Sequence, residues 1–329
     1  MSKMNILLLC GGGSTEHEVS LLSADFLEMQ LKTNPRFDVI RVEITSDGWK
    51  CSDGHLVSLD VNKKALVSDQ HDLTIDYVVP CIHGFPGETG DIQSLLEIAG
   101  IPYFGCNPEA SCNSFNKITS KLWYDTLSIP NTPYLFLTTN DSAAHREAHD
   151  AFEQWGKVFV KAAKQGSSVG CYNVTEKSEL SSSLDAAFGY SDQVVIEKAV
   201  KPRELEVAAY EYQGELHITL PGEVTAPDGA FYSYDEKYSA KSHSTTCVEA
   251  SNLTAEQQVL IKQYSEKVFK QMKLRHLSRI DFFLTEDNEI YLNEVNTFPG
   301  MTPISMFPKM VEHSGVNFAD FIIDCIERS

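Results

Sequence analysis

The sequence predicts an α/β domain followed by two α+β lobes, and three observations support this fold class. In the first third of the chain, apolar runs alternate with segments of helical periodicity, which is typical of a parallel sheet covered by helices. After residue 134 the pattern changes to short strands and hairpins separated by helices. The length of 329 residues also exceeds the roughly 250–300 residues that one hydrophobic core usually serves.

The first third is predicted to contain strands at 5–10, 37–44 and 77–83, helical spacing of apolar residues over 19–29, and a helix at 90–99. Ligands of parallel sheets lie beyond the carboxyl ends of the strands, and two glycine-containing loops occupy that position. They carry Glu16 and Glu88, which could each bind a substrate ammonium group. The alternative is that both are ordinary solvated loop glutamates.

The remaining elements follow in order along the chain. An amphipathic helix at 115–127 ends before a proline-containing break, and a polar, turn-rich loop is expected near 227–246. The other predicted strands are 134–137, 158–162, 170–174, 194–198 and 205–211, with a hairpin over 279–296. The other predicted helices are 143–155, 178–188, 255–272 and a terminal one after Asn317.

Composition excludes several classes of protein. The 46 acidic residues against 27 Lys and Arg give a net charge of −19, which disfavours a nucleic-acid binder. An apolar content of 42% disfavours disorder, and no apolar run approaches the roughly 20 residues of a membrane helix. The eight cysteines form no Cys-x-x-Cys pair, so we expect reduced thiols in a cytoplasmic protein.

The predicted hairpin contains a candidate metal site. If Asp287 and Asn288 form its loop, Asp281 lies directly opposite Glu294, and alternation places Arg279 and Asn296 on the same face. Opposed carboxylates repel unless a cation lies between them, and an all-oxygen set of Asp, Glu and Asn suits Mg²⁺. The alternative is a charged strand that faces solvent.

Two further segments have the composition of ligand-binding loops. Lys161 ends a strand, and the following loop contains Gly166, Ser167 and Ser168, whose N–H and hydroxyl groups could bind phosphate. It is not a Walker P-loop, and an ordinary hairpin loop is the alternative. Residues 231–238 are rich in tyrosine and could form a lid over a site, or simply anchor the loop.

Taken together, these segments resemble the ATP-grasp superfamily and specifically the D-alanine–D-alanine ligases of peptidoglycan synthesis. The similarity runs in family order from the opening signature at 12–20 to Ser305, after the segment 296–302. It implies a pre-ATP-grasp domain at 1–112, a central lobe at 113–199 and a C-terminal lobe with lid and metal site at 200–329. The two lobes would clasp ATP between them.

The resemblance implies a set of ATP-binding residues. Lysines would contact the phosphates, the serine loop would cover them, and the remaining positions would meet the adenine and ribose. These residues are Lys117, Lys161, Ser167, Ser168, Glu197, Lys198, Ala199, Val200, Glu204, Phe231 and Lys237. Asp281, Glu294 and Asn296 would hold two Mg²⁺ ions, with Mn²⁺ as a substitute.

The resemblance also implies how the amino-acid substrates bind. Glu16 would bind the ammonium of the first D-alanine, and Ser305 with Lys237 the carboxylate of the second. Tyr238 would connect Glu16 to Ser167 through hydrogen bonds. Arg279 and the Gly300 N–H would stabilise the tetrahedral oxyanion.

The expected function is ATP-dependent formation of D-alanyl-D-alanine through an acyl phosphate, in cell-wall biogenesis and the maintenance of cell shape. Tyr238 matches the alanine-specific ligases of the family. The alternatives are a ligase that uses D-lactate or D-serine as the acceptor and a catalytically silent ATP-binding regulator. The family resemblance also implies a cytoplasmic homodimer whose ligands are D-alanine and ATP, with no nucleic-acid or membrane partner.

Overall fold

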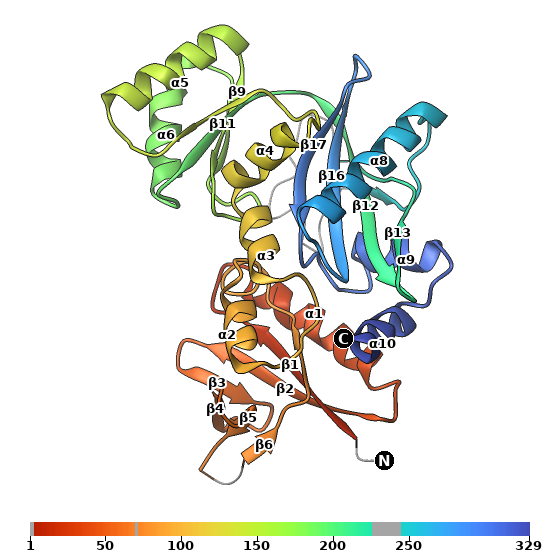
Figure 1. The fold of residues 1–329 in the computed structure, drawn as a ribbon. Coiled ribbons are helices and arrows are strands. Elements are labelled where there is room, and N and C mark those ends of the chain that lie inside the picture. Colours follow the sequence, from red (N-terminus) through yellow and green to blue (C-terminus); the bar gives the residue numbers. More distant parts are fainter. Residues whose placement is uncertain (1–2, 70–71, 226–244) are drawn as a thin grey trace.

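The structure is a computed structural model that describes residues 3–69, 72–225 and 245–329. Figure 1 shows an N-terminal domain at the bottom and two further lobes side by side above it. Each of the three parts is built on its own sheet. The predicted order, an α/β domain followed by two lobes of short strands and helices, is confirmed.

The N-terminal sheet has the order β6-β5-β4-β3-β2-β1-β7, and β1 pairs in parallel with β2 and β7. Side chains of β1 alternate between two cores: Leu8 packs with helix α1, and Leu9 with helix α2. The elements are β1 (Met4–Gly11), α1 (His17–Leu31), β2 (Phe37–Thr45), β3 (Gly48–Cys51), β4 (Leu56–Asp60), β5 (Ala65–Val67), β6 (Asp72–Thr74), β7 (Tyr77–Pro80) and α2 (Asp91–Ala99).

The sequence analysis did not anticipate β3 to β6. These strands pair antiparallel to one another, and β3 pairs antiparallel to β2, so that they extend the parallel part of the sheet. They are only three to five residues long and mix polar with apolar residues, so they lack a clear period. The sheet is therefore mixed, with the predicted parallel strands at one side.

Two short helices lead from the first domain into the middle lobe, where the sequence predicted one amphipathic segment. Helix α3 (Pro108–Phe115) ends just before Asn116, whose side chain accepts a hydrogen bond from the Ile118 N–H and caps α4 (Lys117–Thr126). This cap places Lys117 at the first position of α4. The helix break therefore fixes the start of a helix that carries a predicted phosphate ligand.

The middle lobe is a four-stranded antiparallel sheet with the order β10-β9-β11-β8. The Asp141 side chain caps α5 by accepting hydrogen bonds from two backbone N–H groups. The elements are β8 (Tyr134–Leu137), α5 (Ser142–Trp155), β9 (Val158–Ala162), β10 (Cys171–Val174), a 3₁₀ turn (Lys177–Glu179), α6 (Leu180–Phe188) and β11 (Val194–Lys198). Each predicted strand and helix of this lobe is confirmed within a few residues.

The C-terminal lobe contains a sheet with the order β15-β14-β12-β16-β17, and β13 pairs with β12. A capping box between Thr254 and Gln257 begins α8. The elements are β12 (Pro202–Tyr212), β13 (Glu215–Ile218), β14 (Gly222–Thr225), β15 (Thr245–Cys247), α8 (Ala255–Gln271), β16 (Leu277–Thr285), β17 (Ile290–Asn296), α9 (Met306–His313) and α10 (Phe318–Arg328).

Hydrophobic cores connect the first domain to the C-terminal lobe but leave the middle lobe largely separate. One core combines residues of β1, β7 and α1 with residues of β12, α9 and α10, and the Phe26 and Phe318 rings stack at 5.6 Å. Another core lies entirely between residues 137 and 196. Among the described helices, none has the length and apolarity to cross a membrane.

Candidate active site

The β16–β17 hairpin presents the predicted metal ligands on one face. Asp281 pairs with Glu294 and Arg279 with Asn296, so the predicted opposition is confirmed. The predicted two-residue loop is wrong, however. The Thr285 N–H donates to the Glu289 carbonyl at 3.0 Å, which leaves three residues in the turn. A register shift between Asp281 and Phe282 compensates for the extra turn residue, so that Asp281 still lies opposite Glu294.

Arg279 is held by carboxylates from two strands. Its Nε and Nη2 donate to the two Asp281 oxygens at 2.8 and 2.7 Å, and Glu206 on β12 lies 3.5 Å away. Burial opposes the charge on Arg279, but the Asp281 and Glu206 carboxylates outweigh it and raise the pKa of the guanidinium well above its ordinary value. Asn296 donates to Asp281 at 3.0 Å. The face is therefore a connected polar network.

Three lysines and a glutamate face the hairpin from the middle lobe and α4. Glu197 lies 2.7 Å from Lys161 Nζ and 3.3 Å from Lys121 Nζ. Burial raises the pKa of Glu197, yet the two ammonium groups outweigh it and lower the pKa to about 2. Lys117 donates to the Gln165 carbonyl at 2.6 Å, and burial lowers its pKa. Three cations against one carboxylate make this wall a fitting phosphate subsite.

Lys121 is a site residue that the sequence analysis missed. Its side chain is 2% exposed and also donates to Asn131 and Thr132. The signal was present in the sequence, because Lys121 follows Lys117 by four residues in a predicted helix and so lies on the same face.

The glycine-serine loop after β9 reaches across to the N-terminal domain. Ser167 Oγ donates a hydrogen bond to the Glu16 carboxylate, and both Ser167 and Ser168 have positive φ. A Cβ on Gly166 would lie 2.8 Å from Glu16 Oε2, so a side chain here would require the Glu16 carboxylate to shift. Two residues that are 151 positions apart in the sequence thus meet directly.

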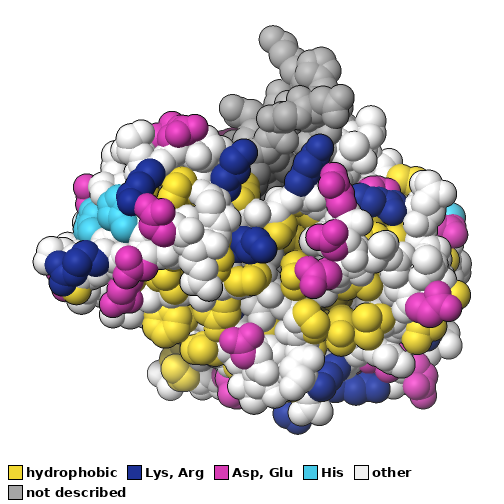
Figure 2. All heavy atoms as spheres, turned by 90° about the horizontal axis from the view of Figure 1, so that it is seen from above, with side chains coloured by type: hydrophobic (Ala, Val, Ile, Leu, Met, Phe, Trp, Pro, Cys, Tyr) yellow, Lys and Arg dark blue, Asp and Glu magenta, His cyan; other side chains and the backbone are white. Residues whose placement is uncertain are grey.

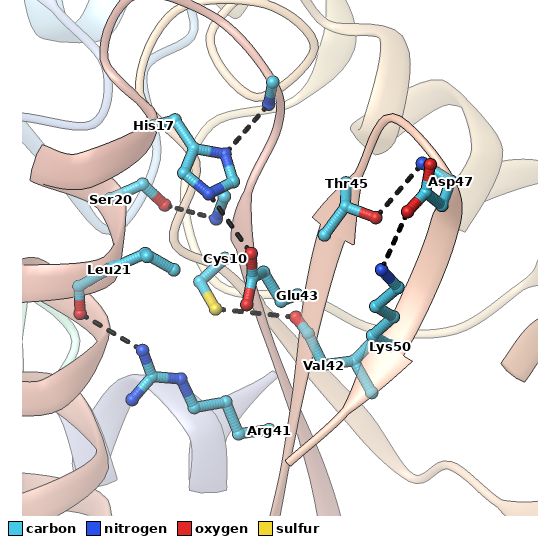
Figure 3. A network of polar contacts seen from close by, with 12 residues as sticks. Cys10, His17, Ser20, Leu21, Arg41, Val42, Glu43, Thr45, Asp47 and Lys50 are labelled. Atoms are coloured by element: carbon cyan, nitrogen blue, oxygen red, sulfur yellow. Dashed lines mark hydrogen bonds and ion pairs between the residues drawn. The ribbon is translucent and has the colours of Figure 1, made fainter. Parts of the chain in front are cut away.

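A hydrogen-bonded network supports the loop that carries Glu16 (Figure 3). The Gly13 N–H donates to His17 Nδ1 at 3.2 Å, and His17 Nε2 lies 3.2 Å from Glu43 on β2. The Gly11 N–H donates to Ser20 Oγ at 2.7 Å. The loop is therefore fixed at both ends by α1 and the adjacent strand.

The second predicted loop places His83 and Glu88 near Glu16. The Gly84 N–H donates to Glu88 at 2.8 Å. Burial, followed by the Glu16 charge, raises the pKa of Glu88 from 4.5 to about 8. Burial likewise lowers the pKa of His83, so the imidazole is neutral at pH 7. Both groups are therefore uncharged or only partly charged at pH 7.

The raised pKa of Glu88 predicts a pH dependence of stability. Because the folded state holds this proton more tightly, the contribution is fully present below pH 4.5 and is lost as pH rises through about 8. We expect the unfolding free energy of the wild type to fall relative to that of Glu88→Gln between pH 5 and 8.5. Urea denaturation across this range measures the difference, and a constant difference would contradict the assignment.

The segment after β17 completes the site. Ser305 Oγ lies 2.7 Å from Thr302 Oγ1 and accepts from the Thr302 N–H at 3.1 Å. A Cβ on Gly300 would lie 2.9 Å from Ser305 Oγ, so the Gly300 backbone lies close to Ser305. Ser305 also precedes α9 directly. The two residues assigned to the second substrate and the oxyanion are thus neighbours.

Two cavities meet at this centre. The larger, of about 460 Å³, is lined by Glu16, His83, Glu88, Gly300 and Ser305. The smaller, of about 100 Å³, is lined by Lys121, Lys161, Ser168, Glu197, Glu204 and Asp281. The two share a wall formed by Lys117, Gln165, Ser167, Glu206, Arg279 and Glu294. The arrangement has room for an amino-acid pair on one side and phosphates on the other.

Some predicted residues do not line either cavity. Lys198 is exposed and its N–H donates to the Pro133 carbonyl, while the Ala199 N–H donates to the Lys157 carbonyl. Val200 is half-buried beside them. Phe231, Lys237 and Tyr238 fall outside the described residues. The adenine and lid assignments therefore stay predictions.

One face of the molecule carries charged side chains of both signs. On the face that Figure 2 shows, the described acidic and basic side chains are interspersed, with hydrophobic groups between them. The lysines of the site, Lys117, Lys121 and Lys161, instead line the smaller cavity.

Three sheets around one cleft, with lysines on one wall and opposed carboxylates on the other, define an ATP-grasp enzyme. The family model for the D-Ala D-Ala ligase N-terminus matches residues 5–106, and the model for the C-terminus matches residues 123–327. The chain therefore belongs to the D-alanine–D-alanine ligase family.

Individual relatives agree with this assignment. The chain is 73% identical to a D-alanine–D-alanine ligase of Vibrio parahaemolyticus over 99% of both chains. A solved structure of D-alanyl-alanine synthetase A from Vibrio cholerae is 64% identical, with a TM-score of 0.96 over 100% of this chain and 98% of that one. A D-Ala:D-Ser ligase from Enterococcus faecalis is 28% identical, with a TM-score of 0.87 over 99% of both chains.

Proposed function

We propose that this protein joins two D-alanine molecules to D-alanyl-D-alanine with hydrolysis of ATP to ADP and phosphate. The observation that supports the proposal is the wall shared by the two cavities: Ser167, Arg279 and Glu294 line both, and the proposal assigns one cavity to the amino acids and the other to the phosphates. High identity to named ligases over the whole chain supports the same activity. The product serves peptidoglycan synthesis.

The first step activates a carboxylate. In the proposal Glu16, supported by Ser167, binds the ammonium of the first D-alanine and thereby directs its carboxylate toward the γ-phosphate of ATP. The carboxylate oxygen attacks the γ-phosphorus, and ADP leaves. Lys117 and Lys161 hold the phosphates and neutralise the charge that spreads over their oxygens. The product of this step is an acyl phosphate.

The second step forms the peptide bond. The second D-alanine, held through its carboxylate near Ser305, attacks the acyl carbon with its neutral amine. Arg279 and the Gly300 N–H bind the oxyanion that develops, and inorganic phosphate leaves as the amine loses its proton. One oxyanion donor of this kind is typically worth about 3–4 kcal/mol.

The donor set on the hairpin fits Mg²⁺. Asp281 and Glu294 oppose each other on one face, and Asn296 adds an amide oxygen. Among the described residues, no group of three His, Cys, Asp or Glu side chains could hold a metal ion by itself. Bound there, two Mg²⁺ ions, or Mn²⁺ in their place, would neutralise phosphate charge.

The remaining proposals rest on the family resemblance. The domain limits are 1–112, 113–199 and 200–329. Lys198, Ala199, Val200, Glu204 and Phe231 contribute to nucleotide binding, and Lys237 and Tyr238 close over the substrates. The protein acts as a homodimer in the cytoplasm.

A coupled assay of ADP release tests the function with a panel of acceptors. With Mg²⁺ and ATP, we expect turnover with D-alanine as sole amino acid and a product mass of the dipeptide. Mixtures of D-alanine with D-serine or D-lactate separate the alternatives, because D-alanyl-D-alanine should remain the main product. A folded, ATP-binding protein without D-alanine-dependent ADP release would refute the proposal.

A further inference from the structure

The turn that carries Gly300 is tied to the N-terminal domain at both ends. His83 Nδ1 lies 3.2 Å from the Phe298 carbonyl oxygen, and the Met301 N–H donates to Ser23 Oγ at 3.3 Å. Ser23 Oγ in turn lies 2.9 Å from His83 Nε2. Ser23 comes from α1 and His83 from the loop after β7, so two elements of the first domain hold four residues of the C-terminal lobe.

The hydrogen atoms of this network fit only one arrangement. An amide N–H can only donate, so Ser23 Oγ accepts from Met301. A carbonyl oxygen can only accept, so His83 Nδ1 carries a proton and donates to Phe298. A neutral imidazole then leaves Nε2 as an acceptor for the Ser23 hydroxyl hydrogen. Each of the three donors in this network therefore has an acceptor.

The network is enclosed and has little freedom. Ser23 and Met301 are fully buried, and His83 is 3% exposed. The His83 and Phe298 rings also pack at 5.8 Å. Buried hydrogen bonds of this kind fix side-chain and backbone geometry because breaking one leaves an unsatisfied polar group. The peptide groups of the turn are therefore held in one position.

We infer that Ser23, acting through His83 and Met301, is a positioning residue that aims the Gly300 N–H at the reacting carbonyl. The inference rests on the proposed function, which makes Gly300 an oxyanion donor. Ser23 belongs to α1, which begins one residue after Glu16, so the same helix would position the first D-alanine and the oxyanion donor. Binding of the substrate and stabilisation of the transition state would then share one rigid support.

The position of an oxyanion donor affects the two chemical steps differently. Formation of the acyl phosphate is a phosphoryl transfer that does not need Gly300, whereas attack by the amine does. Displacement of a catalytic group by an ångström can cost about 100-fold, and loss of Ser23 shifts the turn without removing the donor. We therefore expect about a 10-fold slower second step in Ser23→Ala.

Rapid-quench measurements on the full-length protein, with labelled ATP and saturating D-alanine, separate the two steps. For Ser23→Ala we expect an ADP burst at the wild-type rate, slower dipeptide formation, and an ADP to dipeptide ratio above one, because the waiting acyl phosphate hydrolyses. The KM for ATP should stay within about twofold of the wild type. Ser23→Thr, which retains the hydroxyl, should restore a ratio near one.

Ser265→Ala is the matched control. Ser265 is also a fully buried helical serine, and its hydroxyl donates only to the Ile261 carbonyl on α8. Both alanine variants should remain folded, with the lower Tm in Ser23→Ala because it leaves the Met301 N–H without its acceptor, and only Ser23→Ala should change the ratio. Wild-type rates and ratio in Ser23→Ala, or equal slowing of both steps, would overturn the inference. Absence of dipeptide from the wild type would instead overturn the proposed function itself.

Discussion

Replacement of Glu294 by glutamine is expected to lower kcat by about a thousandfold, because the proposed metal site would lose one of its two carboxylates. Glu294 faces Asp281 across the hairpin and lies in the wall shared by both cavities. The change keeps the shape of the side chain and removes only its charge. A charge-dependent role therefore predicts a large loss of activity in a folded protein.

Two measurements distinguish this role from a structural one. The coupled ADP assay gives kcat, and Mn²⁺ binding monitored by electron paramagnetic resonance in the presence of ATP gives metal occupancy. Glu286→Gln is the control, because Glu286 is an exposed carboxylate in the turn of the same hairpin. It should leave both values unchanged. Near-normal turnover and Mn²⁺ binding in Glu294→Gln would refute the metal assignment.

Arg279→Met is expected to reduce the free energy of unfolding by about 3–5 kcal/mol, because it removes the guanidinium that faces two buried carboxylates. The side chains of Asp281 and Glu206 are only 12% and 10% exposed. Urea denaturation measures the loss. Adding Glu206→Gln should recover part of it, since one of the two carboxylate charges that faced Arg279 disappears. A double variant no more stable than the single one would contradict this explanation.

Arg203→Met provides the comparison. Arg203 also makes a two-point contact with a carboxylate, donating to Glu223 at 2.8 Å through both Nε and Nη2. The side chains of Arg203 and Glu223 are 33% and 18% exposed, so water reaches this pair, including the Glu223 carboxylate that remains, more readily than it reaches Asp281 and Glu206. We therefore expect a loss of no more than about 1 kcal/mol. The difference in the loss of unfolding free energy between Arg279→Met and Arg203→Met then reports how burial changes the contribution of an arginine–carboxylate pair.

The elements with strong sequence periods were predictable, and the weakly patterned ones were not. The apolar run of β1 and the spacing of α1 indicated a buried parallel strand and its covering helix. Strands β3 to β6 escaped prediction because pieces of three to five residues are too short to show a period. Their pairing depends on neighbours that a local pattern does not contain.

The site shows the same division. The opposition of Asp281 and Glu294 was predicted from strand alternation and an assumed two-residue turn. The turn has three residues, and the opposition holds because a register shift offsets the extra one. The family resemblance linked Ser167 to Glu16 only through Tyr238; their direct contact was not predicted, because it joins two domains. The link between Ser23 and His83 carries no local signal at all, since the fold alone brings together residues 60 positions apart.

The separate core of the middle lobe gives the protein two cooperative units. Most buried side chains of β9 and β11 pack in a core within that lobe, whereas β1 shares its core with the C-terminal helices. Amide protons of the middle lobe should therefore exchange with solvent through openings that leave the rest of the molecule intact. Nucleotide bound across the cleft would add its binding free energy to that smaller unit. The concentration of ATP would then set how often the middle lobe opens.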